Sequence, residues 1–264
     1  MSFNWNNFPY EEIEVKDLTT SDYTSKAKSI SMYNPNKERI EEVSVVSNDY
    51  LLASNMQVKN MQDEFVSKTN IPFNESKVFF NGKTFARFMK TNQFTTSVNV
   101  GDDIALGMFA MNSYDGSVKL HFGLYAERLV CTNGMISKTF FMQHHFKHSK
   151  ENMTWSDQLN NAYRTMYEIN AEKSLQEFTN GLKQLTQRKC TVETLQKLRA
   201  TEFGQLPITT WGKVVDRFLF SEEETVYGAY NAVTNILWHN QSPSIQDIKM
   251  NRNITDLLMS TVAA

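Results

Sequence analysis

An Asp-Gly turn between two runs of alternating residues constrains the fold of this chain more than any other feature. It lies within residues 102–135, and the second run places apolar side chains at every other position: Val118, Leu120, Phe122 and Leu124. Successive side chains of a β-strand point to opposite faces, so this spacing predicts a strand with one buried face. The side chains between them, Ser117, Lys119, His121 and Tyr125, fall on the other face. The segment therefore predicts an antiparallel hairpin with one covered face and one partly open face.

More strands are predicted in front of this segment. The strand-like runs are residues 78–80, 83–89, 94–100 and 104–111. Asn81-Gly82 separates the first two runs, and this pair readily supplies the two positive φ angles of a type I′ turn. We therefore expect an antiparallel meander over the sheet-rich residues 75–141.

Helical spacing dominates much of the remaining sequence. A short strand at residues 42–46 precedes an amphipathic run that starts after Ser47 and ends near Asn70. From residue 151 onward apolar residues recur three and four positions apart, and Ser221–Glu224 has the sequence of a capping box. The expected fold class is α+β: an antiparallel β-meander sheet with helices packed on one face and a mainly helical C-terminal half, residues 151–264.

The first 39 residues are polar and only weakly periodic. We expect residues 1–39 to form an arm in front of a single α+β domain, residues 40–264. The chain has 2 cysteines, which suits a reducing cytoplasm and not a disulfide framework. No apolar run approaches the ~20 residues that a membrane span requires, and the start of the sequence lacks the basic segment of a secretory signal. A cytoplasmic protein without membrane contact is expected.

Charge is balanced over the whole chain but not along it. The sequence holds 27 basic and 29 acidic residues, so net charge gives no argument for nucleic acid or membrane. Residues 75–150 nevertheless hold 9 Lys/Arg against 5 Asp/Glu, whereas residues 1–74 hold 7 against 11. The basic middle third is where contacts with phosphate are expected.

A nucleic-acid groove on the open face of the meander is the first candidate site. Proteins that bind single strands combine cations that follow the phosphates with aromatic rings on which bases stack. The expected polar contacts are Lys77, Lys83, Arg87, Lys90, Lys119, His121, Arg128, Lys138, Lys147 and Lys150, and the expected stacking residues are Tyr114 and Tyr125. The alternative is that these cations lie on ordinary solvated strands and that the rings belong to the core.

The hexapeptide Asn112–Ser117 is the second candidate. Asn, Asp and Ser side chains hydrogen-bond neighbouring backbone groups, so closing a hairpin is the favoured interpretation. The functional alternative is that Asn112 and Asp115 present oxygen atoms to a metal ion or another ligand at the rim of the sheet. No cofactor is expected.

Cysteine and histidine give weaker signals. Cys131 follows a strand-like run and no base is evident beside it, so a buried structural thiol is favoured over a nucleophile. His144 and His148 would lie one turn apart on a helix, as zinc ligands do, but no further ligand is adjacent. A basic linker is the favoured interpretation of residues 144–150.

Three segments together resemble a known family. They are Val43–Asn55, Asn112–Met135 and Thr225–His239, and the likeness spans roughly residues 40–260. The family is the phage/plasmid-like proteins grouped as a domain of unknown function, found in phages, prophages and plasmids. The predicted order of strands and helices is also similar to the β-β-β-α core of single-strand annealing recombinases. This resemblance implies a phage or mobile-element protein in the cytoplasm of a host cell.

The sequence lacks the motifs of several enzyme classes. It has no Walker-type phosphate loop, no Gly-x-Gly-x-x-Gly, no Gly-x-Ser-x-Gly and no Cys-x-x-Cys pair. We therefore expect a non-enzymatic, ATP-independent protein that binds single-stranded DNA as a homo-oligomer, in annealing, recombination or replication. The alternative is an interaction protein that binds and diverts a host factor. An enzyme with a site at the Asn112–Ser117 rim ranks third.

Overall fold

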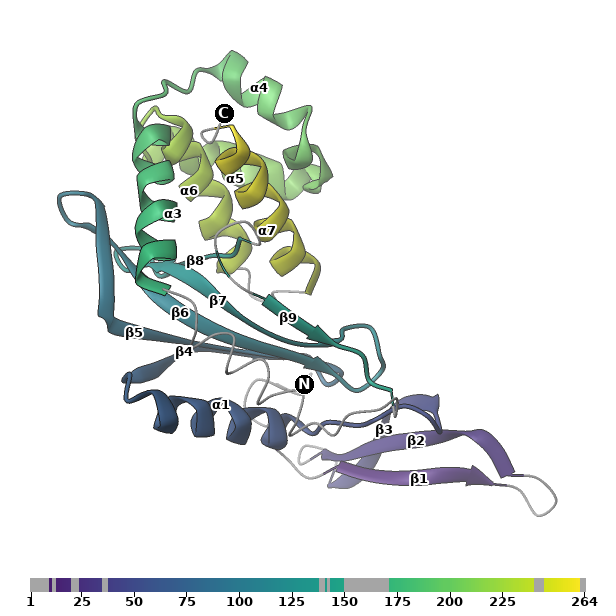
Figure 1. Cartoon of the computed structure of the whole chain (residues 1–264). Helices are drawn as coiled ribbons and strands as arrows, with labels where there is room; N and C mark the ends of the chain where they lie inside the picture. The colour runs from purple at the N-terminus through teal and green to yellow at the C-terminus, as the bar shows by residue number, and fades with distance from the viewer. Residues whose placement is uncertain are drawn as a thin grey trace. The chain divides into compact units, whose positions relative to one another are not determined.

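The computed structural model is an α+β protein, and it describes residues 10, 13–19, 24–34, 38–137, 141, 143–149, 171–239 and 245–261 (Figure 1). The strands are β1 Ile13–Thr19, β2 Thr24–Asn34, β3 Arg39–Ser47, β4 Phe73–Phe80, β5 Thr84–Asn99, β6 Asp102–Ser113, β7 Leu120–Arg128, β8 Asn133–Met135 and β9 Gln143–Phe146. The α-helices are α1 Asn55–Thr69, α3 Ala171–Thr186, α4 Val192–Arg199, α5 Ile208–Ser221, α6 Val226–Trp238 and α7 Ile245–Ser260, with a 3₁₀ helix at Glu202–Gln205. The predicted fold class is confirmed.

The strands form two sheets. One has the order β1-β2-β3, and the other has the order β4-β5-β6-β7-β8 with β9 also paired to β7. Sequential strands lie beside one another, which is the expected meander. The chain divides into two compact units, and three long strands contribute residues to both. Unit 1 comprises residues 1–89, 108–123 and 143–169, and unit 2 comprises residues 90–107, 124–142 and 170–264.

Part of the predicted N-terminal arm is a β-sheet in unit 1. Strand β2 pairs antiparallel with β1 on one side and with β3 on the other. Ile30, Met32 and Asn34 alternate along β2 and are all buried, with exposed fractions of 0%, 1% and 1%. These strands were not predicted because only two of these buried positions, Ile30 and Met32, are apolar, which is too short an alternation to indicate a strand.

Helix α1 of unit 1 starts later than predicted. Its N-cap is Ser54 and not Ser47, because Ser54 accepts a hydrogen bond from the backbone of Gln57 and the Gln57 side chain accepts one in return. The predicted end is confirmed, since Asn70 adopts a left-handed conformation with φ 55°. Val58 and Phe65 are among the residues that the helix buries.

The turn after β4 differs from the predicted type I′ geometry. Only Gly82 has a positive φ angle, 91°, while the Asn81 side chain accepts hydrogen bonds from the backbone of Lys83 at 3.1 Å and Thr84 at 2.8 Å. Asparagine can close a turn through its side chain as well as through its backbone conformation. The predicted hairpin position is therefore confirmed, but its turn type is wrong.

Unit 2 contains the helical C-terminal region. Helix α6 is buried along nearly its whole length, and it contacts α3, α5, α7 and strand β8. Gly134 of β8 leaves room for the ring of Trp238, since a Cβ there would lie 2.4 Å from the ring. Figure 1 shows α3, α6 and α7 together beside β8. The predicted helical half is confirmed where the structure describes it, from residue 171 onward.

One predicted cap in unit 2 is wrong. The Ser221–Glu224 segment does not start a helix: α5 ends at Ser221, and α6 begins after Thr225, whose side chain accepts from the backbone of Gly228 at 3.0 Å. The short link between the two helices places Glu222 and Glu223 at the end of α5. Both glutamates line a cavity in unit 2.

Candidate functional site

The predicted stacking residues are core residues. Tyr114 and Tyr125 are both 0% exposed. In unit 1 the Tyr114 hydroxyl accepts from the backbone of Asn55 at 3.1 Å, and in unit 2 the Tyr125 ring stacks on Trp238 with centroids 5.8 Å apart. A base cannot reach either ring, so the stacking prediction is wrong. Tyr125 lies on β7, whose residues are buried on both faces, and Tyr114 lies in the turn after β6.

Arg87 in unit 1 is neutralised by acidic neighbours. Its guanidinium contacts Asp63 at 2.8 Å and Glu75 at 2.7 Å, and the residue is 5% exposed. Burial by itself would raise the pKa of Asp63, but hydrogen bonds from Lys59 and Arg87 hold that pKa below its usual value. The predicted phosphate contact by Arg87 is therefore corrected to a structural ion-pair cluster.

Lys90 of unit 2 and His121 of unit 1 are also committed to protein contacts. The Lys90 ammonium lies 2.6 Å from a carboxylate oxygen of Glu127, which is 1% exposed. His121 is 3% exposed, and its ring lies 3.8 Å from that of His145 and 4.9 Å from that of Phe109, centroid to centroid. Neither side chain lies on an open cationic face of the sheet, so the predicted phosphate contacts of Lys90 and His121 are corrected to contacts within the protein.

The exposed cations of the predicted set are Lys83, Lys119 and Lys147, all in unit 1. Leu120 of β7 pairs with Phe146 of β9, so Lys119 precedes one strand where Lys147 follows the other. Lys83 lies in the turn after β4. Burial by itself would raise the pKa of Asp115, but hydrogen bonds with Ser117 lower that pKa, and the charge of Lys83 lowers it further. Lys77 is half-buried, and Lys138 and Lys150 lie outside the described residues.

The Asn112–Ser117 hexapeptide closes the hairpin between β6 and β7. The Asn112 amide is 0% exposed and donates to Ala53 at 2.8 Å, while Ser117 donates its backbone N–H to the Asp115 carboxylate at 2.9 Å. The side chain of Ser113 bonds the backbone of Val118 in both directions. These contacts support the structural interpretation, and Asn112 is inaccessible as a metal ligand.

The histidine pair does not have the geometry of a helical zinc site. Residues 143–146 form strand β9, so His144 and His148 do not lie one helical turn apart. The Nδ1 of His148 donates to the carbonyl of Leu51 at 3.0 Å. The His148 ring stacks on that of Tyr50, with centroids 4.6 Å apart. Within the part of the chain that the structure describes, no group of three or more His, Cys, Asp or Glu is placed to hold a metal ion.

Cys131 is half-buried in a turn and not buried in a strand as predicted. Arg128 lies 3.6 Å from its sulfur, and the His239 ring approaches the backbone carbonyl of Cys131, not the thiol, at 2.9 Å. A general base for thiolate formation is therefore not supplied by His239 in this arrangement.

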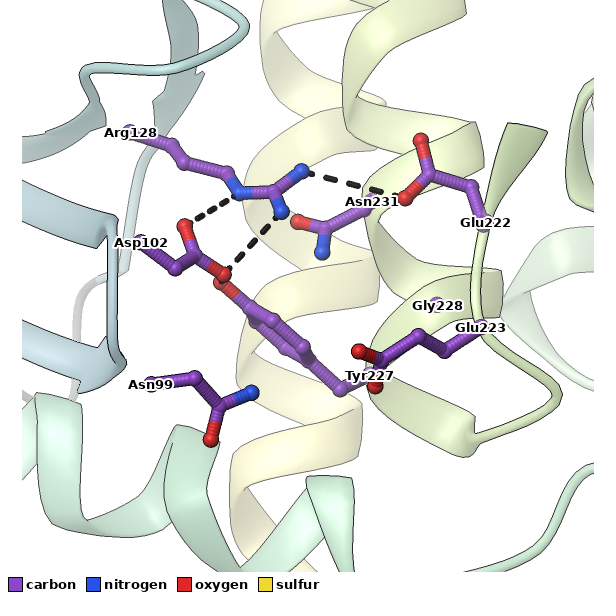
Figure 2. Close-up of a pocket in the computed structure, with 8 residues that line it drawn as sticks. All are labelled: Asn99, Asp102, Arg128, Glu222, Glu223, Tyr227, Gly228 and Asn231. Carbon is purple, nitrogen blue, oxygen red and sulfur yellow. Dashed lines mark hydrogen bonds and ion pairs between the residues drawn. The ribbon is translucent and has the colours of Figure 1, made fainter.

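A small cavity in unit 2 collects charged side chains that the sequence does not bring together. Its volume is about 220 Å³. The lining residues are Asn99, Asp102, Arg128, Glu222, Glu223, Tyr227, Gly228 and Asn231 (Figure 2). They come from the ends of β5, β6, β7 and α5 and from the first turns of α6. Strand pairing and the short link after α5 therefore bring them to one place.

An ion pair forms one wall of this cavity. Arg128 donates to the two carboxylate oxygens of Asp102 at 2.6 and 3.0 Å, and the Tyr227 hydroxyl donates to the same carboxylate at 2.9 Å (Figure 2). The guanidinium also lies over the Tyr227 ring, 5.5 Å from its centroid. Burial raises the pKa of Tyr227, so this phenol keeps its proton and remains a donor.

Glu222 sits between two guanidinium groups. It lies 3.8 Å from Arg128 and 3.3 Å from Arg217, and its side chain is 6% exposed. Burial raises its pKa, although both arginines act in the opposite direction. Burial therefore offsets the stabilisation that the two arginines give to the charged form of Glu222.

The comparisons with known proteins give a family but no activity. A family model described as "Domain of unknown function (DUF932)" matches residues 42–258. The chain belongs to this family. The DUF932 match covers all three segments that carried the sequence resemblance. Searches of curated proteins and of solved structures each gave no significant match.

The cavity was missed because each of its residues has an ordinary local explanation. Arg128 was predicted only as a contact with phosphate, and Asp102 belongs to no recognised motif. One signal was present: Tyr227 and Asn231 lie in the third segment of the family resemblance, close to the acidic residues at the end of α5.

Of the helices the structure describes, none has the length and apolar character to cross a membrane.

Proposed function

We propose that this chain binds the phosphate backbone of single-stranded nucleic acid, in an ATP-independent role such as strand annealing by a phage or mobile-element protein. The observation that carries the proposal is the pair of exposed lysines, Lys119 and Lys147, at the same end of the paired strands β7 and β9. Among the residues that the structure describes, neither has an acidic partner. Lys83 extends the exposed cations of unit 1.

Two lysines at one end of a strand pair repel each other in the free protein. A phosphate between them removes that repulsion and releases counterions from the nucleic acid. Because Tyr114 and Tyr125 are buried, the proposed contact is with the backbone and depends little on the base. The predicted affinity therefore falls steeply with salt and shows no strong preference for sequence.

The test is the salt dependence of binding to a labelled oligothymidylate, measured by fluorescence anisotropy. Removing both charges with Lys119→Gln and Lys147→Gln should lower the slope of log K against log salt by about 1.4, because each contact with a single strand contributes about 0.7. A matched double variant, Lys183→Gln with Lys197→Gln, removes two exposed charges from unit 2. An equal loss in both doubles would show that only net charge matters and would defeat the proposal.

A second candidate function is binding to a host protein. Its supporting observation is apolar exposure in unit 2: Phe220 is 84% exposed, Leu219 56%, Val100 106% and Val130 61%. Leu219 and Phe220 are adjacent in the chain, and exposed apolar patches are typical of protein-interaction surfaces. Loss of a captured partner on Phe220→Ser, with folding unchanged, is the expected result for this function. Capture that Phe220→Ser leaves intact would count against it.

A further inference from the structure

We infer that the phosphate-binding surface extends from Lys119 and Lys147 onto strand β2, where Lys26 makes a further phosphate contact. This inference rests on the proposed function and adds to it a residue from outside the family match, which begins at residue 42. It depends on contacts of Tyr50 and its neighbours that join separate segments of unit 1, and on the surplus of lysine in those segments.

Tyr50 connects the three-stranded sheet to the end of the β7–β9 pair. Its ring stacks on that of His148, and it forms an isolated antiparallel β-bridge with Ser149. The backbone N–H of Leu51 donates to the carbonyl of His148 at 3.1 Å. Lys147 immediately precedes His148, so the turn after β3 lies beside the residues that follow β9.

Lys119 belongs to the same group of contacts. The Tyr50 hydroxyl donates to the carbonyl of Ser113 at 2.6 Å. The Ser113 hydroxyl in turn bonds the backbone of Val118, which immediately precedes Lys119. Both lysines at the end of the β7–β9 pair are therefore connected to Tyr50 through short contacts.

The first residues of β2 also contact the turn that carries Tyr50. Asn48 donates its backbone N–H to the carbonyl of Lys26 at 3.0 Å and its side-chain amide to the carbonyl of Ser25 at 3.2 Å. The Lys28 ammonium donates to the carbonyl of Tyr50 at 2.7 Å. Strand β2 is thereby held against this turn, and the side chain of Lys26 is exposed.

Lysine outnumbers acidic residues in the segments that these contacts join. In residues 25–28, 47–50, 83–84, 113–119 and 146–149 the lysines are Lys26, Lys28, Lys83, Lys119 and Lys147, and the acidic residues are Asp49 and Asp115. Five lysines against two aspartates leave a net charge of +3. Phosphates that approach this group relieve the repulsion between the lysines and release counterions from the nucleic acid.

One strand of nucleic acid is long enough to reach both ends of this group. The path from Lys26 to Lys147 passes through Asn48, Tyr50 and Ser149. Two backbone contacts and two steps of two residues span at most about 25 Å. At the rise of about 3.4 Å per nucleotide of a stacked strand, roughly eight nucleotides cover this length, which is within the usual size of a single-strand site.

The first test is the salt dependence of binding to a labelled oligothymidylate of twelve nucleotides. Lys26→Gln should lower the slope of log K against log salt by about 0.7, the contribution of one contact with a single strand. The change keeps the backbone carbonyl that accepts from Asn48, so the fold is preserved.

The matched control is Lys16→Gln, on the neighbouring strand β1. The Lys16 side chain is 67% exposed and already lies 2.9 Å from a carboxylate oxygen of Glu14, so its loss should leave the slope unchanged. Equal effects of Lys16→Gln and Lys26→Gln would show that only net charge matters and would overturn the inference.

The second test requires no substitution. The full chain is acetylated with N-hydroxysuccinimidyl acetate, with and without the oligothymidylate, and mass spectrometry measures the modification of each lysine. Acetylation of Lys26 should slow as much as that of Lys119 and Lys147, while that of Lys16 should not change. Protection of Lys119 and Lys147 without Lys26 would overturn this inference and leave the proposed function intact. If the oligothymidylate protects none of the three lysines, both fail.

Discussion

Basic side chains differ between the end of the β7–β9 pair in unit 1 and the cavity in unit 2. They are exposed in the first region and paired with a carboxylate in the second. Lys119 and Lys147 are exposed and have no acidic partner among the described residues, whereas Arg128 is held by Asp102 through two hydrogen bonds. A basic residue in a strand is therefore no indication of a binding surface until its partner is known. In this chain the two lysines without an acidic partner among the described residues are exposed, and the paired Arg128 lines a cavity.

The largest effect is expected from breaking the ion pair of the cavity. Asp102→Asn leaves the charged, partly buried Arg128 beside a neutral amide, which has only one oxygen to accept from the guanidinium and from the Tyr227 hydroxyl. We expect the free energy of unfolding to fall by about 3 kcal/mol, as for other buried pairs that lose one partner. Urea denaturation measures this change.

The neighbouring residue is the control for that prediction. Asp103 is half-buried and is bonded to the side chain of Ser97, so Asp103→Asn should cost less than about 1 kcal/mol. Similar losses for the two variants would show that the bidentate pair is no more important than a surface contact, and the contrast between the two regions would disappear.

A smaller effect is expected from Tyr125→Phe. This change removes the hydrogen bond of 2.6 Å between the hydroxyl and the Glu127 carboxylate but keeps the ring in the core. Stability should fall by about 1 kcal/mol, and affinity for single-stranded DNA should stay unchanged. The exposed residue Tyr33 provides the control variant, Tyr33→Phe, which should change neither quantity. Weaker DNA binding by Tyr125→Phe without loss of stability would contradict the buried position of the ring.

The smallest effect is a dependence of stability on pH in unit 1. Burial lowers the pKa of His148, although hydrogen bonds with the backbone of Leu51 and Val118 act the other way. The unfolded chain therefore takes up a proton at higher pH than the folded chain does. The stabilising contribution is complete above the unfolded pKa, about 6.5, and is lost as the pH falls from there toward the lower folded pKa.

Urea midpoints measured across this pH range test the assignment. His148→Gln should flatten the fall in stability, with a remainder from His144, whose pKa burial also lowers. An unchanged slope in His148→Gln would show that this imidazole is not the group that titrates.

Much of the fold could be predicted, because its signals are local. Alternation located β6 and β7, and Asn70 marked the end of α1. The predictions failed where the competing alternatives were equally local. Ser47 and Ser54 are both reasonable helix caps, and only Ser54 has a reciprocal hydrogen bond with Gln57.

The candidate site could be predicted only in part. Lys119 and Lys147 belong to the basic middle third of the sequence and are both exposed, and their contact with phosphate stays a prediction. The tyrosines were placed on an open face because alternation distinguishes two faces but does not show whether another element covers the second. For Tyr125 that element includes Trp238, more than a hundred positions away in the sequence.

The sequence by itself determined β6, β7, the hairpin at Asn112–Ser117 and the helical C-terminal region, since these depend on side-chain spacing and on hydrogen bonds between near neighbours. Only the tertiary structure decided which charges are neutralised. Asp102 and Arg128 are 26 positions apart, and Asp102 and Tyr227 are 125 apart. The free energy of a charge depends on the groups within a few ångströms of it, and folding alone selects those groups.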